Sequence, residues 1–188
     1  MADRIFIVRH GETEWSANGR HTSVTDLPLT TNGRTQAEIA AEKVMGEQFA
    51  LVLCSPRLRA RQTAEIAGFG ETAERCDDIV EWDYGKYEGL TSTEIWERHD
   101  PDWNLWRDGC PGGESPAEVG ARVDRVLQRF ATVDGDGLVF AHGHILRVLT
   151  ARWCEMEVAA GAHFKLATAA IGVLGHERAT TTIDRWSA

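Results

Sequence analysis

The chain has 188 residues, of which 43% are apolar and 26% are charged, and its formal net charge is -9 at pH 7. This size and balance predict a single globular domain over residues 1–188 with a substantial core. The acidic surplus argues against nucleic acid as a partner, because proteins that bind it usually present a basic face. The chain lacks a secretory signal pattern and any run of roughly 18 apolar residues that would cross a membrane. We therefore expect a cytoplasmic protein that binds neither nucleic acid nor membranes.

The cysteines are far apart in the sequence and form no CxxC pair: Cys54, Cys76, Cys110 and Cys154. Such spacing is typical neither of zinc sites nor of redox motifs. In a reducing cytosol they are expected to be free thiols. His142 and His144 follow a predicted strand at alternate positions, which face opposite ways, and no Cys or carboxylate is near them. We expect no metal site and no cofactor.

Short apolar runs predict buried strands along the chain. The first covers residues 4–8, the second 49–54 and a later one 137–141, with a weaker candidate at 76–80. Helical patterns separate these runs, and strands that are apolar on both faces are typical of parallel sheets covered on both sides. The predicted fold class is therefore α/β, with a mostly parallel sheet between two layers of helices.

Helices are expected between these strands. One covers about residues 31–47, where alanines and a valine recur at helical spacing, and a second begins near Arg57. The clearest start is Ser115-Pro116-Ala117-Glu118, a capping box with proline at the first helical position. The remaining predictions are a helix at about 145–154 and two short strands within 166–184, on either side of Gly175-His176.

Polar residues follow three of the predicted strands. They are Arg9-His10-Gly11-Glu12, then Ser55-Pro56 with Arg57 and Arg59, and finally His142-Gly143-His144. Because ligands of open parallel sheets bind beyond the carboxyl ends of the strands, these segments are expected to converge on one pocket. Two histidines and two or more arginines suit a phosphate group, since guanidinium forks match its oxygens and an imidazole can attack or donate.

The same segments carry a resemblance to a known family. Arg9-His10-Gly11-Glu12-Thr13 resembles the RHGE(T/S) motif of the histidine phosphatase superfamily, whose fold is phosphoglycerate mutase-like. Further matching segments follow in the family's order over about residues 4–150: TDLPLTTNGRTQA, Ser55 to Ala64, Glu81 to Gly89, and FAHGH. The resemblance implies that fold and a phosphoryl transfer through a phosphohistidine.

The resemblance also assigns catalytic roles. His10 is the nucleophile, and Glu81 is the proton donor to the leaving oxygen. Arg9 and Arg59 bind the phosphoryl oxygens, and a protonated His142 donates to them. Two arginines and such a histidine can neutralise the transferring group without a metal ion. Glu81 must be protonated in the first step, and it would then take a proton from the attacking water.

Two details of this assignment depend on neighbouring residues. Arg59 fits the family spacing of arginine, alanine, two residues and threonine better than Arg61 does, whereas Arg57 either faces the pocket mouth or is solvated. The attacking nitrogen of His10 must be neutral, so its other ring nitrogen is expected to bond to a backbone carbonyl such as that of Gly11.

For substrate binding we predict Ser16, Thr22, Ser23, Tyr84 and Gly143. Segments such as TEWSANGR and NLWRDGC are similar to those of phosphatases for small sugar phosphates, so the expected partner is a small phosphate ester. Ser16 and Ser23 depart from the pattern of cofactor-dependent phosphoglycerate mutases. A mutase, a phosphatase of protein phosphohistidine and a non-enzymatic phosphate-binding module are the alternatives, and a homodimer stays open.

Overall fold

The computed structural model describes residues 2–188. Its centre is a six-stranded sheet in the order β3-β2-β4-β1-β5-β6. The first four strands in this order are parallel, while β5 and β6 are antiparallel to their neighbours, which confirms the mostly parallel sheet. The strands are β1 (Ile5–Arg9), β2 (Phe49–Cys54), β3 (Glu74–Arg75), β4 (Asp136–Ala141), β5 (Ile171–Glu177) and β6 (Thr180–Arg185).

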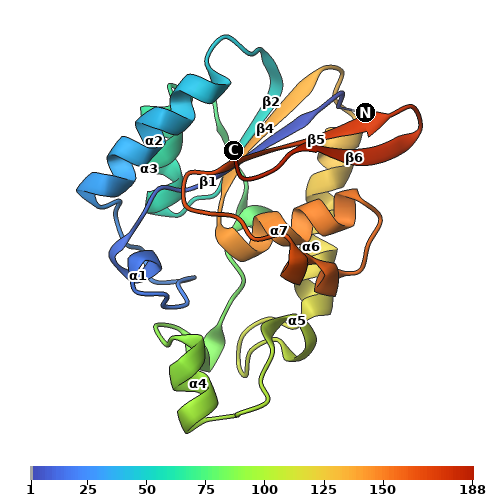
Figure 1. Cartoon of the computed structure of the whole chain (residues 1–188). Coiled ribbons are helices and arrows are strands. Elements are labelled where there is room, and N and C mark those ends of the chain that lie inside the picture. Colours follow the sequence, from blue (N-terminus) through green and yellow to red (C-terminus); the bar gives the residue numbers. More distant parts are fainter. Residues whose placement is uncertain (1) are drawn as a thin grey trace.

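Helices cover both faces of the sheet, as predicted (Figure 1). One layer holds α2 (Thr31–Val44) and α3 (Leu58–Ile66), and the other holds α6 (Pro116–Ala131) and α7 (Gly143–Trp153). The helix α6 begins at the predicted capping box, with Ser115 as N-cap. The shorter elements are α1 (Glu14–Ala17), α4 (Ser92–Arg98), α5 (Leu105–Asp108) and the 3₁₀ helices η1 (Asp77–Ile79), η2 (Gly85–Tyr87) and η3 (Val158–His163).

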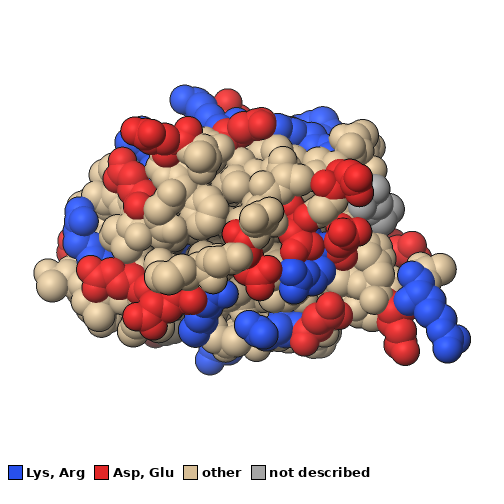
Figure 2. Space-filling view, turned by 90° about the horizontal axis from the view of Figure 1, so that it is seen from above, with Lys and Arg blue, Asp and Glu red and all other residues tan. Residues whose placement is uncertain are grey.

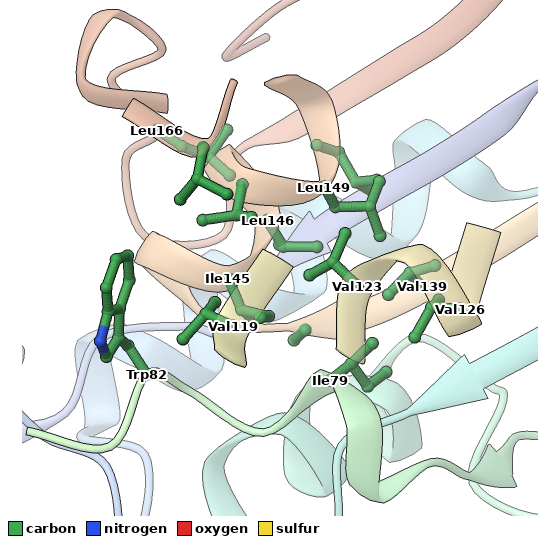
Figure 3. Close-up of a cluster of buried hydrophobic side chains, with 14 of the residues drawn as sticks. Ile79, Trp82, Val119, Val123, Val126, Val139, Ile145, Leu146, Leu149 and Leu166 are labelled. Carbon is green, nitrogen blue, oxygen red and sulfur yellow. The ribbon is translucent and has the colours of Figure 1, made fainter. Parts of the chain in front are cut away.

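Side chains along the central strands alternate between two hydrophobic cores. In β1, Ile5 and Ile7 join the core beneath α6 and α7, whereas Phe6 and Val8 join the core beneath α2 and α3. Such alternation follows from the two-residue period of a strand. Figure 3 shows part of the first core, in which side chains of α6 and α7 meet those of the segment around η1. The sheet is therefore held rigidly from both sides.

The weak strand candidate at 76–80 is wrong. β3 is confined to Glu74–Arg75, and the chain then forms the 3₁₀ helix η1. Ile79 is fully buried in the core beneath α6, so its apolar character reflects burial in a turn rather than strand pairing. A short apolar run does not by itself distinguish these two structures.

Two other boundaries differ from the predictions. The C-terminal hairpin turns after Glu177 and not at Gly175-His176, because the β-branched threonines from Thr180 onward pair with the end of β5. The helix α2 ends at Val44 rather than at residue 47, since Met45 already has an extended backbone (ψ 129°). Neither change moves the ends of the parallel strands.

Charged side chains of both signs are interspersed on the face shown in Figure 2. Over residues 2–188, none of the helices has the length and apolar character needed to cross a membrane. The four cysteines are free thiols, as predicted.

Candidate active site

The polar segments after β1, β2 and β4 lie next to one another, because these strands are neighbours in the sheet. The backbone N–H of His10 donates to the carbonyl of Ala141 (3.0 Å), and that of Ser55 donates to the carbonyl of Phe140 (3.0 Å). His142 follows directly, and its ring centroid lies 5.2 Å from that of His10. The structure thus brings the three predicted segments together at one edge of the sheet.

His10 is buried and has a defined tautomer. Its Nδ1 lies 2.7 Å from the carbonyl oxygen of Gly11, as predicted, and a carbonyl only accepts, so Nδ1 carries the proton. Burial, followed by the positive charges of Arg59 and Arg9, lowers the pKa of His10 well below its usual value. The ring is therefore neutral near pH 7, and its Nε2 keeps a lone pair.

The loop that carries His10 is pressed against the start of α2. A Cβ atom on Gly11 would collide with the carbonyl of Gly33, and one on Gly33 would collide with the carbonyl of Glu12. On the other side, the Thr63 hydroxyl accepts the backbone N–H of Gly11 (3.1 Å). The close approach of the two backbones therefore requires glycine at both positions.

Arg59 lies in the first turn of α3 and is fully buried. Its Nε donates to Nδ1 of His142 (3.1 Å), and its Nη atoms donate to the backbone carbonyls of Thr22 (3.0 Å), Ser23 (3.3 Å) and Thr25 (3.2 Å). The guanidinium is thus held rigidly beside His142, behind the wall of the pocket.

His142 is neutral in this arrangement. Since a guanidinium only donates, Nδ1 of His142 must accept from Arg59, and the ring proton is on Nε2, 2.7 Å from the Ser55 hydroxyl oxygen. Burial and then the charge of Arg59 lower the pKa of His142 well below its usual value. The prediction of a protonated His142 does not match this geometry, because a second ring N–H would point at the guanidinium.

Arg9 borders the pocket directly. One of its Nη atoms donates to the Leu166 carbonyl (2.6 Å), while its Nε is buried with no hydrogen-bond partner among residues 2–188. Gly143 makes room for this side chain, since a Cβ there would lie 3.3 Å from the guanidinium carbon. The guanidinium at the pocket wall is suited to bind an anionic oxygen.

Glu81 faces the N-terminus of α7. Its Oε1 accepts the backbone N–H groups of Trp82 (3.0 Å) and Ile145 (2.9 Å), and its Oε2 accepts that of His144 (3.0 Å). These three donors fix the orientation of the carboxyl group at the start of α7. Oε2 makes one bond fewer than Oε1 and is the oxygen with room for a proton.

The pocket has a volume of about 250 Å³. Of the five predicted catalytic residues, Arg9, His10 and Glu81 lie on its wall, and Arg59 and His142 lie behind it. Of the predicted substrate-binding residues, the wall includes Ser16, Thr22, Tyr84 and Gly143. Ser23 is buried elsewhere, where its hydroxyl donates to the Glu81 carbonyl (3.2 Å). A larger cavity of about 350 Å³, between β2 and α3, contains neither His10 nor Glu81.

Four basic wall residues were not predicted: Arg20, His21, His144 and Arg147. His144 bonds through Nδ1 to the Tyr84 hydroxyl (2.6 Å), and its ring is stacked 6.1 Å from that of His21. Two of them belong to segments that the sequence analysis marked: His144 follows His142 and Gly143, and Arg20 ends the segment TEWSANGR. The other two, Arg147 in α7 and His21 in the loop after α1, were not marked, and no local pattern indicates that these two segments meet.

Buried histidines make the stability of the protein depend on pH. The folded-state pKa is lowered, with burial as the main cause, for His10, His21, His142 and His144. Below about pH 6.5 the unfolded chain therefore binds more protons than the folded one. Each such histidine then lowers the free energy of unfolding by about 1.4 kcal/mol per pH unit. We expect the free energy of unfolding, measured with urea, to fall between pH 7.5 and pH 5. Constant stability over this range would contradict the assignment.

The arrangement defines a site for phosphoryl transfer. A neutral imidazole with a free Nε2, a guanidinium with an unpaired donor and a carboxyl group share one small polar pocket. These are a nucleophile, an anion-binding group and a proton carrier. Within residues 2–188, no three His, Cys, Asp or Glu side chains are grouped so as to hold a metal ion.

Comparison with known proteins identifies the family. The family model described as histidine phosphatase superfamily (branch 1) matches residues 5–188. An acid phosphatase from Mycobacterium tuberculosis is 44% identical over 181 residues, 93% of this chain and 87% of that protein. Sedoheptulose 1,7-bisphosphatase from Saccharomyces cerevisiae is 38% identical over 189 residues, 84% of this chain and 70% of that protein. A solved structure of an open reading frame product from Mycobacterium tuberculosis has a TM-score of 0.91 at 40% identity and covers 100% of this chain and 98% of its own. The chain belongs to the histidine phosphatase superfamily.

Proposed function

We propose that this protein hydrolyses phosphate monoesters of small metabolites, in particular sugar phosphates, through a phosphohistidine intermediate on His10. Phosphomonoester hydrolysis itself follows from the family and from the phosphatase relatives. The observation that carries the chemical proposal is His10, whose protonated Nδ1 leaves Nε2 free at the pocket wall. No metal ion or cofactor enters the proposed steps.

In the first step, Nε2 of His10 attacks the phosphorus atom, and the bond from phosphorus to the ester oxygen breaks. Glu81 gives its proton to that oxygen, so the alcohol leaves and Glu81 becomes a carboxylate. Arg9 at the pocket wall and Arg59 behind it offset the charge of the phosphoryl oxygens. His142, whose Nε2–H is bonded to the Ser55 hydroxyl, accepts from Arg59 through Nδ1 and keeps that guanidinium in place. The product of this step is a phosphohistidine.

In the second step, water attacks the phosphohistidine. Glu81 takes a proton from that water, the bond from phosphorus to nitrogen breaks, and inorganic phosphate leaves. His10 returns to its neutral form and Glu81 to its protonated form. The backbone N–H groups of Trp82, His144 and Ile145 support Glu81 in the carboxylate state between the two steps.

The pocket wall favours a polar alcohol as the leaving group. Beyond His10 the wall is formed by hydroxyl, imidazole and guanidinium groups, among them Thr22, His21 and Arg147. Such groups are complementary to sugar hydroxyls, as donors and as acceptors. The two relatives named above, an acid phosphatase and a sugar bisphosphatase, support the same class of substrate. The cytoplasm stays the predicted location, and the four free thiols favour it.

A panel of phosphate esters tests this proposal. We expect chelator-resistant release of phosphate from p-nitrophenyl phosphate and, with higher kcat/KM, from sugar phosphates and bisphosphates. Phosphorus NMR with 3-phosphoglycerate distinguishes release from relocation. Phosphate that moves between hydroxyls would indicate a mutase, and binding of phosphate without turnover of any ester would indicate a binding module.

A further inference from the structure

Arg122, on α6, donates from both Nη atoms to the segment that carries Glu81. It is 6% exposed. Its Nη1 donates to the carbonyls of Asp78 (2.8 Å) and Val80 (2.7 Å), and its Nη2 donates to the carbonyl of Glu81 itself (3.2 Å). The carbonyls of this irregular segment have no strand partner, so a single side chain satisfies three of them.

Glu114 completes this arrangement from the opposite side of the guanidinium. Its carboxylate accepts Nε (2.7 Å) and Nη2 (2.8 Å) of Arg122 in a two-pronged ion pair. The same carboxylate accepts the backbone N–H of Asp83 (2.9 Å), and the Glu114 carbonyl accepts the indole N–H of Trp82 (2.9 Å). The pair therefore holds the chain both before and after Glu81.

The side chains on either side of Glu81 are anchored in the core. Ile79 and Trp82 point into the cluster beneath α6, toward Val119 and Ile145 (Figure 3). The Glu81 side chain instead reaches the N-terminus of α7 at the pocket. With its backbone carbonyl bound to Arg122, Glu81 has little freedom to shift relative to that helix.

We infer that the Arg122–Glu114 ion pair is a positioning device for Glu81, which sets the reach of its carboxyl group toward the leaving oxygen. The inference rests on the proposed acid and base role of Glu81. Neither residue touches the pocket. A structural role alone would change the amount of folded protein, whereas a positioning role changes the proton transfer.

Leaving-group dependence separates these two roles. Alkyl phosphates such as glycerol 2-phosphate need a proton on the leaving oxygen, whereas p-nitrophenolate leaves without one. In Arg122→Lys, the ammonium group cannot replace a fork that reaches three carbonyls and a carboxylate. We expect kcat/KM for glycerol 2-phosphate to fall about 10-fold beyond any fall for p-nitrophenyl phosphate, which is less than the roughly 10²- to 10⁴-fold of a complete loss of acid–base catalysis.

The ratio of the two kcat/KM values, measured on one preparation, does not depend on how much of the protein is folded. Arg152→Lys is the matched control, because Arg152 makes a two-pronged pair with Asp124 between α7 and α6 (2.8 and 3.0 Å) that does not reach Glu81. Its ratio should equal that of the unmodified protein. Glu114→Gln weakens the Arg122–Glu114 ion pair by removing the charge of Glu114. It should therefore lower kcat/KM for glycerol 2-phosphate relative to p-nitrophenyl phosphate, as Arg122→Lys does.

Glu81→Gln is assayed in parallel. If it loses activity selectively on glycerol 2-phosphate while Arg122→Lys and Glu114→Gln lose activity equally on both esters, the positioning inference is overturned and the proposed function stands. If Glu81→Gln also loses activity equally on both esters, the acid role of Glu81 falls, and the inference falls with it.

Discussion

Replacement of His10 by alanine is expected to abolish phosphate release from every ester of the panel. The variant lacks the imidazole whose free Nε2, fixed tautomer and lowered pKa suit it to attack from the end of β1. Loss of a nucleophile typically costs about 10⁴-fold or more in kcat. We expect a loss of this size, measured by phosphate release at pH 7.

Labelling provides the second readout for His10. After an alkaline quench, the unmodified protein should retain phosphate on this histidine, and His10→Ala should retain none. His99→Ala is the control, because His99 is exposed and packs on Tyr87 outside the pocket. Turnover by His10→Ala within 10-fold of the unmodified protein, about 1.4 kcal/mol in barrier height, would refute the nucleophile assignment.

Replacement of Glu81 by glutamine should impair both half-reactions. An amide neither donates the proton to an alkoxide nor takes one from water, so kcat/KM for glycerol 2-phosphate should fall by about 10²- to 10⁴-fold. For p-nitrophenyl phosphate, kcat/KM should fall much less, but the phosphohistidine should accumulate because water is no longer activated. Rapid mixing should then show a burst of p-nitrophenolate followed by slow turnover.

The matched control for Glu81 is Glu118→Gln. Glu118 forms the capping box with Ser115 at the exposed start of α6. The substitution Glu118→Gln therefore removes the same charge as Glu81→Gln, but outside the pocket. Its kinetics should equal those of the unmodified protein. If Glu81→Gln turned over both esters without a burst and with unchanged kcat/KM, another group would have to carry the proton.

The strands and the catalytic segments were predictable because their signals are local. β1, β2 and β4 are short apolar runs that end at polar residues. Such a run predicts a buried strand of a parallel sheet from its own residues, without reference to distant segments. Once these strands are placed side by side, His10, Ser55 and His142 must meet at one edge. The capping box at Ser115 is equally local, and α6 begins there.

Other features depend on packing between distant segments. Arg59 and His142 are 83 positions apart, and only their contact decides that the His142 ring is neutral with its proton on Nε2. The Arg122–Glu114 pair reaches Glu81 only because α6 packs against η1, and the sequence marked neither residue as functional. Buried hydrogen bonds of this kind depend on which backbone groups the fold leaves without partners, and that is set by the tertiary structure.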